Sequence, residues 1–289
     1  MKNKYTISLL FTFFLSSMFC LAQQQEPKPV KLNKISDNLF EILDGKGARG
    51  GLFIGDNGVM VIDAKQDEIS VKQTLEGIAK ITGKPIKYLI DTHSDGDHVT
   101  GNQFFPTSVT IISHENCRKE FFHAKRDGSL SDWNKPELLP FIPSVTFNNQ
   151  MDIYLGSQKV ELLYFGIGHT TGDLVVYFRD QKVAFIGDQV FTGRPQLIHT
   201  YKGGNSFEHV KTLTKMLEVL DAEKFFSGHS EMLNRAGIQQ HIDEMKELQN
   251  KIKSLIAKNK SLDEIKSEFD QSQRTLVETI FNEIKNNIE

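Results

Sequence analysis

Cysteine is almost absent from this chain of 289 residues, which contains only Cys20 and Cys117. Cys20 lies in an N-terminal segment that we expect to be removed, so the mature chain could form no internal disulfide. Cys117 has no second cysteine at the spacing of a metal-ligand pair, and we interpret it as a packed or partly exposed thiol. The fold must therefore rest on the packing of its core.

A large excess of one charge is missing as well. The formal net charge is -3, the isoelectric point is near 6.3, and no basic run follows any one segment. Nucleic acid is therefore not an expected partner. Hydrophobic residues make up 39% of the chain, enough to bury a substantial core, but the chain is short for two full enzymatic domains. We expect one large domain.

The longest apolar run stands at the N-terminus. Lys2 and Lys4 precede an apolar stretch from about residue 7 to 19, and Ala22 provides a small residue before a plausible cut. This pattern is typical of a secretory signal peptide, and the stretch is shorter than the roughly 20 residues that span a bilayer. We predict cleavage after Ala22, in preference to an uncleaved anchor or a lipoprotein linked through Cys20. The mature chain is then expected in the periplasm or secreted, without stable membrane insertion.

Short apolar runs alternate with turn signals through most of the remaining chain. The polar residues 23–30 predict a linker, after which regular structure should begin near Lys31. Two strand-rich halves, each closed by helices, suit two packed sheets with helices outside. The predicted strands are 39–42, 52–54, 59–62, 86–90, 109–112, 153–155, 160–165, 174–178, 183–186 and 224–226, and the predicted helices are 68–81, one from about 115, and 206–220.

Two segments depart from this alternation. The stretch 128–147 contains three prolines and predicts irregular structure, which near a site could act as a lid. From about residue 238 the chain is helical and charged, and Ser261 and Glu264 match a capping box. We predict a catalytic domain over 31–237 and a C-terminal helical extension over 238–289 that packs on its edge.

The most informative stretch is Asp-Thr-His-Ser-Asp-Gly-Asp-His at residues 91–98, directly after the strand 86–90. A lone histidine beside an aspartate would be ordinary surface, but here four potential ligands fall within six residues. Imidazole and carboxylate groups are common ligands of divalent metals, and a cation would relieve the repulsion between the carboxylates. The four candidate ligands are His93, Asp95, Asp97 and His98.

Three further candidates each follow an apolar strand and a glycine: His169, Asp188 and His229. Loops at strand ends present catalytic groups, and a neighbouring glycine allows the backbone to approach closely. Taken together with the first four, these residues predict metal binding. The other histidines lack this context, and we assign them surface or packing roles: His114, His123, His199, His209 and His241.

These motifs resemble those of the metallo-β-lactamase-fold superfamily, in its glyoxalase II-like and β-lactamase-like branch. Its members carry H-x-H-x-D-H after a strand, a downstream histidine, a bridging residue and a last histidine, and the resemblance runs from about Lys31 to Arg235. It implies an α/β fold, a four-layer αβ/βα sandwich with a dinuclear site at the sheet edges. It also implies that His93, Asp95 and His169 hold one metal, that Asp97, His98 and His229 hold the other, and that Asp188 bridges them.

Asp95 departs from this pattern, because the family has its second histidine at this place. With Asp97 and Asp188 it makes three anionic ligands, so two divalent ions and a bridging hydroxide would leave about zero net charge instead of about +1. Oxygen ligands favour harder ions, whereas imidazole suits zinc. We expect two divalent ions, zinc first, with manganese or iron as alternatives because of Asp95.

The resemblance implies hydrolysis of a small-molecule ester, thioester or amide, a β-lactam included, by water that the metals activate and Asp97 helps to orient. Export favours a lactam or another envelope substrate, whereas aspartate at position 188 counts mildly against the best-known lactamases. Two alternatives stay open: an iron-dependent redox enzyme of the same fold, and a metal-binding protein without catalysis. Arg194 and Lys202, in the loop after Asp188, could anchor a substrate carboxylate.

Overall fold

The computed structural model describes residues 27–125 and 127–286. The predicted signal peptide, its cleavage point and the first half of the predicted linker lie outside these residues, so they stay predictions. Residues 27–30 carry no regular structure, and the first strand begins at Lys31. Within the described part of the chain, no helix is long and apolar enough to cross a membrane.

The strands form two mixed sheets. The first has the order β1 (Lys31–Lys34), β2 (Leu39–Leu43), β3 (Gly50–Ile54), β4 (Val59–Ile62), β5 (Ile86–Ile90), β6 (Thr110–His114) and β7 (Val145–Phe147). Its strands are antiparallel from β1 to β4 and parallel from β4 to β7. The second has the order β12 (Lys224–Phe226), β11 (Val183–Phe185), β10 (Val175–Phe178), β9 (Gln158–Leu163) and β8 (Gln150–Leu155), with only β11 and β12 parallel.

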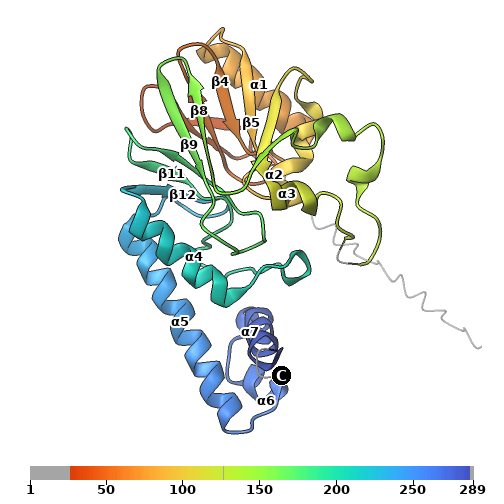
Figure 1. The fold of residues 1–289 in the computed structure, drawn as a ribbon, viewed down its shortest axis with the longest axis vertical. Coiled ribbons are helices and arrows are strands. Elements are labelled where there is room, and N and C mark those ends of the chain that lie inside the picture. The colour runs from red at the N-terminus through yellow and green to blue at the C-terminus, as the bar shows by residue number, and fades with distance from the viewer. Residues whose placement is uncertain (1–26, 126, 287–289) are drawn as a thin grey trace, which may run out of the picture.

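Helices cover the outer faces of the two sheets (Figure 1). Helix α1 (Glu68–Ile81) lies on the first sheet, and α4 (Ser206–Val219) and α5 (Arg235–Ala257) lie on the second. The short helices α2 (Gly96–Val99) and α3 (Glu115–Glu120) follow β5 and β6. The order helix, sheet, sheet, helix is the predicted four-layer sandwich, so the fold prediction is confirmed.

The alternation of side chains along each strand builds these layers. On β4, Met60 and Ile62 pack between the two sheets, whereas Val59 and Val61 pack against α1. On β10 the residues alternate in the same way between the second sheet's inner face and the layer of α4 and α5. Because successive side chains of a strand point to opposite faces, a fully apolar strand serves two cores at once.

The C-terminal helices share a core with the second sheet. Helix α5 begins at Arg235 and crosses the predicted boundary after residue 237, and α6 (Leu262–Ser267) and α7 (Arg274–Asn286) fold back beside it. The capping box of Ser261 and Glu264 is present at the start of α6, as predicted. The division into a domain over 31–237 and an extension over 238–289 stays a prediction.

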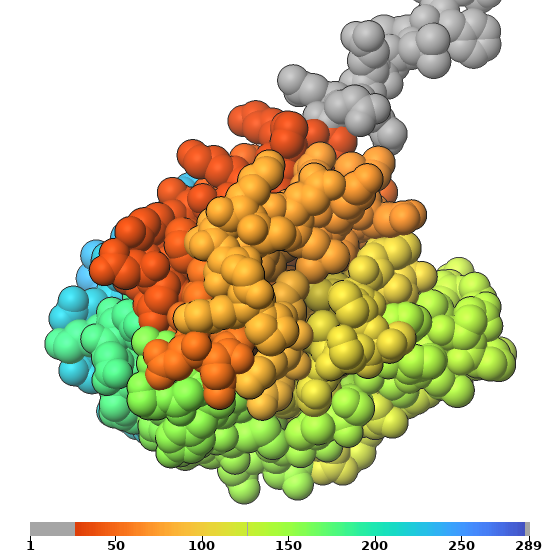
Figure 2. All heavy atoms as spheres, turned by 90° about the horizontal axis from the view of Figure 1, so that it is seen from above, coloured from red at the N-terminus to blue at the C-terminus, as the bar shows by residue number. Residues whose placement is uncertain are grey.

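Two short edge strands, β1 and β7, were not predicted from the sequence. β7 lies within the stretch predicted to be irregular, and its three residues are too few to show a period. Before β7 the stretch contains two short 3-10 turns, Asp132–Asn134 and Leu139–Phe141. Figure 2 shows this yellow-green segment projecting from one side of the molecule.

Candidate metal centre

The seven predicted ligands come together at one edge of the two sheets. Four follow β5 in the loop and the first turn of α2, and the others follow β9, β11 and β12. The glycines beside them are required by the close packing: a Cβ on Gly228 would lie 2.4 Å from Asp188 Oδ1 and 2.6 Å from His98 Cε1. Gly187, before Asp188, has a φ of 52°, which favours glycine.

The ligand atoms form two groups, each with all its members within 4.8 Å of one another. One is buried and contains His93, Asp95, His169 and Asp188, and the other contains Asp97, His98 and His229. Asp188 faces both, because its Oδ1 lies 3.2 Å from His98 Nε2 and its Oδ2 lies 3.8 Å from His93 Nε2. The grouping agrees with the one implied by the resemblance, while the binding of metal by these residues stays a prediction.

Several of these buried atoms lack a hydrogen-bond partner in the described structure: His93 Nε2, His98 Nε2 and Asp188 Oδ1. Buried polar atoms are nearly always hydrogen-bonded, so unpaired atoms that face one another at a ligand cluster need a further partner. A set of imidazole nitrogens and carboxylate oxygens suits divalent metal ions. The residues present therefore fit two such ions.

Second partners fix the orientation of two imidazoles. His98 Nδ1 lies 2.8 Å from Asp63 Oδ2, and His169 Nδ1 donates to the carbonyl of Leu197 at 2.8 Å. Burial lowers the pKa of His98, but the carboxylates of Asp188 and Asp63 outweigh it and raise that pKa well above its usual value. In both residues Nε2 is left to face the cluster.

Asp63 was not predicted as a site residue, although it follows an apolar strand as the predicted ligands do. It directly follows the apolar strand β4 and so reaches the same sheet edge. Thr92 fixes its carboxylate, since the Thr92 backbone N–H and hydroxyl both donate to it, at 2.9 Å and 2.9 Å.

The surroundings of Asp95 include His199 and Lys202. His199 was assigned a surface or packing role outside the site, but the structure buries it beside the ligand cluster, with its Nε2 2.8 Å from Asp95 Oδ2. Lys202 was named as a residue that could anchor a substrate carboxylate, and this role stays a prediction. Its ammonium donates to Asp95 Oδ1 at 2.7 Å and to Ser94 Oγ at 2.8 Å. Both residues lie more than 100 positions from Asp95, so no local pattern could indicate these contacts.

Arg194 lies in another environment. Its guanidinium carbon lies 4.1 Å from the centre of the Phe191 ring, and Phe191 stacks on His229 with ring centres 5.6 Å apart. The Phe191 ring thus lies between Arg194 and His229. From this position the Arg194 guanidinium can contact a substrate bound at the cluster. Its predicted role as an anchor is retained.

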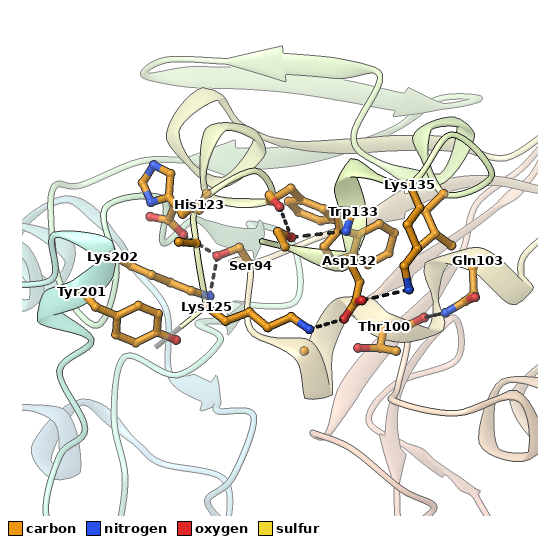
Figure 3. A pocket seen from close by; sticks show the side chains of 16 residues that line it. Ser94, Thr100, Gln103, His123, Lys125, Asp132, Trp133, Lys135, Tyr201 and Lys202 are labelled. Atoms are coloured by element: carbon orange, nitrogen blue, oxygen red, sulfur yellow. Dashed lines mark hydrogen bonds and ion pairs between the residues drawn. The ribbon is translucent and has the colours of Figure 1, made fainter. Parts of the chain in front are cut away.

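A cavity of about 440 Å³ lies beside Asp95, and Ser94, Gly96 and Lys202 form part of its wall. Trp133 and Lys135, from the stretch 128–147, also line it, on the side away from Lys202 (Figure 3). The stretch predicted to be a possible lid therefore borders a space next to the ligand cluster. Whether it moves stays a prediction.

Comparison with known proteins agrees with this geometry. A metallo-β-lactamase type 2 from Elizabethkingia meningoseptica is 25% identical over 252 residues, covering 80% of this chain and 90% of that protein. The alpha subunit of a 2,4-dinitroanisole O-demethylase from Nocardioides sp. (strain JS1661) is 25% identical over 217 residues, covering 73% of this chain and 58% of that subunit.

The fold is shared with a solved structure, a metallo-β-lactamase from Pontibacter korlensis, at a TM-score of 0.63 and 17% identity, covering 75% of this chain and 99% of that one. The profile of the Metallo-beta-lactamase superfamily matches residues 51–229, a span that contains every predicted ligand. This match, with the four-layer sandwich and the His/Asp cluster at its edge, shows that the chain belongs to the metallo-β-lactamase superfamily and is a hydrolase of that type.

Proposed function

We propose that the chain is an exported hydrolase that uses two divalent metal ions, zinc first, to cleave an ester, thioester or amide bond of a small molecule, with a β-lactam as one candidate substrate. The observation that carries the proposal is the pair of ligand groups, with Asp188 in one and 3.2 Å from His98 of the other, together with the buried ligand atoms that have no hydrogen-bond partner in the described structure. When bound, such ions lower the pKa of water and polarise a carbonyl group. Manganese or iron remains an alternative to zinc.

Asp97 is the carboxylate of this cluster that is best placed to act on water. Its side chain is 30% exposed, whereas that of Asp95 is 11% exposed and that of Asp188 is 4% exposed. Burial raises its pKa, but the hydrogen bond from His229 and the charge of His98 outweigh this and lower the pKa. Asp97 is therefore ionised near neutral pH and can accept a hydrogen bond from an attacking water.

The substrate would reach the cluster from the side of Asp97 and His229. The cavity beside Asp95 offers Trp133 and Tyr201 for a flat apolar group. Arg194, above Phe191, is our candidate for binding a substrate carboxylate. Lactams are candidate substrates because the Elizabethkingia relative is a metallo-β-lactamase. The O-demethylase subunit acts in different chemistry, so substrates other than lactams must also be tested.

The experiment combines metal analysis of the purified full chain with hydrolysis of nitrocefin, a p-nitrophenyl ester and a thioester. We expect two zinc equivalents and turnover of at least one substrate class. Asp97→Asn should lower kcat/KM at least about 100-fold, since general acid–base groups contribute on that order. The control Asp152→Asn, on β8 in a pair with Lys159 at 3.3 Å, should have no effect.

Other outcomes favour the alternatives. One bound metal without turnover of any substrate would support a metal-binding protein. Bound iron, together with oxidation of a substrate and no hydrolysis, would support the redox enzyme. Retention of the signal segment after expression in a bacterial host would contradict export, and mass spectrometry of the purified chain reads this out directly.

A further inference from the structure

The Asp95 carboxylate contacts three nitrogen groups, and a histidine at this position could not accept hydrogen bonds from all three. Its Oδ1 accepts from the Lys202 ammonium at 2.7 Å, and its Oδ2 lies 2.9 Å from His169 Nε2 and 2.8 Å from His199 Nε2. Lys202 is buried, with 8% of its surface exposed. Burial of a lysine is costly unless its charge is paired, so this pair is part of how the site is built.

A network fixes the Lys202 ammonium in place. Ser94 accepts from Lys202 and donates its own proton to Glu120 Oε2 at 2.5 Å, and the backbone N–H of Thr171 donates to Glu120 Oε1 at 2.9 Å. Figure 3 shows the Lys202 side chain reaching Ser94 along the wall of the cavity. The 3-10 turn Thr200–Lys202 is held by the bond from His199 N to the carbonyl of His169, at 2.8 Å.

We propose that Lys202 is the built-in counter-ion of Asp95, a positioning residue that compensates for a carboxylate where the family has a histidine. The inference rests on the proposed metal site. When the ligand set binds metal, Asp95, Asp97 and Asp188 would be ionised and the histidines neutral, so Lys202 would reduce the formal charge of the set from -3 to -2. A set with histidine at position 95 and no lysine would carry this same charge, so Lys202 offsets the effect of Asp95 on the net charge of the site.

The test is a double-mutant cycle on the full chain, with zinc affinity as the readout. The proteins are the wild type, Asp95→His, Lys202→Met and the double variant, each stripped with a chelator and titrated with Zn²⁺ against a chelating dye. Asp95→His alone leaves an unpaired ammonium beside the metal and should weaken one zinc equivalent. Adding Lys202→Met to it should restore that affinity at least tenfold, whereas Lys202→Met in the wild type should give no such gain.

Two matched variants separate compensation from simple charge removal. Lys202→Arg keeps the charge, so Asp95→His with Lys202→Arg should stay as weak as Asp95→His. Lys125→Met removes another lysine of the same cavity, one paired with Asp132 at 2.6 Å, and should not restore binding. If Asp95→His does not fold, Asp95→Asn also leaves the ammonium unpaired and takes its place in the cycle.

Equal gains from Lys202→Met in both backgrounds would overturn the inference, since Lys202 would then be only a nearby positive charge. Zinc binding with no coupling would overturn it while leaving the proposed metal site intact. A wild-type chain that takes up no metal would overturn both. Two bound zinc ions with coupling but no hydrolysis would support Lys202 as the counter-ion and contradict the proposed function alone.

Discussion

The carboxylate of Asp63 lies 2.8 Å from His98 Nδ1 and also accepts two bonds from Thr92. All of its neighbours at these positions present N–H or O–H groups, so both oxygens must act as acceptors. This arrangement fixes the tautomer of His98 and directs its Nε2 toward Asp188, at 3.2 Å. Asp63 therefore orients a predicted metal ligand without being one.

Asp63→Asn should weaken zinc binding at the group containing His98. In either orientation of the amide, an NH₂ group would meet the N–H of Thr92 or that of His98. We expect a loss of affinity of about 10- to 100-fold, the usual effect of removing such a partner. Titration with a chelating dye measures it, with Asp152→Asn as the control, and unchanged affinity would show that His98 needs no fixed partner.

Gly228→Ala should disrupt the cluster without unfolding the chain. The new Cβ would lie 2.4 Å from Asp188 Oδ1 and 2.6 Å from His98 Cε1, so both ligands must shift. We expect loss of at least one zinc equivalent, with the circular dichroism spectrum retained. The matched control is Gly83→Ala, where nothing lies within 4 Å of the new Cβ. Two zinc ions bound at wild-type affinity would contradict the packing described here.

Glu283→Ala should weaken the packing of α7 against the start of α4. The buried Glu283 carboxylate accepts from the Ser206 backbone N–H at 2.9 Å and from the Ser206 hydroxyl, at the N-terminal end of α4. Loss of a buried acceptor should lower the free energy of unfolding by about 1–3 kcal/mol. Urea denaturation measures this. Glu278→Ala on the same helix, half-exposed and paired with Lys266, should cost less than about 1 kcal/mol.

Acid should destabilise the packing of α4 against α5. His209 Nε2 lies 3.3 Å from His241 Nε2 between these helices, and burial lowers the pKa of His241 to about 4 against the opposing charge of Glu244. Because the unfolded chain takes up a proton near pH 6.5 and the folded chain only near pH 4, stability is full above pH 6.5 and falls below it.

His241→Gln should remove the part of this dependence that His241 contributes, while burial still lowers the pKa of His209 well below its usual value. The difference in free energy of unfolding between wild type and variant should be constant above pH 6.5 and shrink or reverse by up to about 3 kcal/mol as the pH falls to 4, at about 1.4 kcal/mol per pKa unit. Urea denaturation of both proteins at pH 7, 6, 5 and 4 measures it. Parallel curves over this range would show that His241 is not buried in the neutral form.

Much of the fold could be predicted from the sequence because its signals are local. Apolar strands such as β4 and β10 show their burial in four consecutive residues, and the capping box of Ser261 and Glu264 marks the start of α6 within three positions. The seven candidate ligands could be predicted for the same reason. Each lies in the segment that follows a strand, and all but His98 lie within a few residues of the strand end or beside a glycine. The edge strands β1 and β7 were too short to be predicted.

The sequence by itself therefore determined the layers and which loops would meet at the sheet edge, since strand period and strand ends are encoded residue by residue. Only the tertiary structure decided what surrounds each ligand. His199 and Lys202 reach Asp95 because the loop after β11 folds back across the end of β5, and Asp63 reaches His98 because β4 lies beside β5. These contacts join residues 35 to 107 positions apart, and their chemistry arises only once the core has packed.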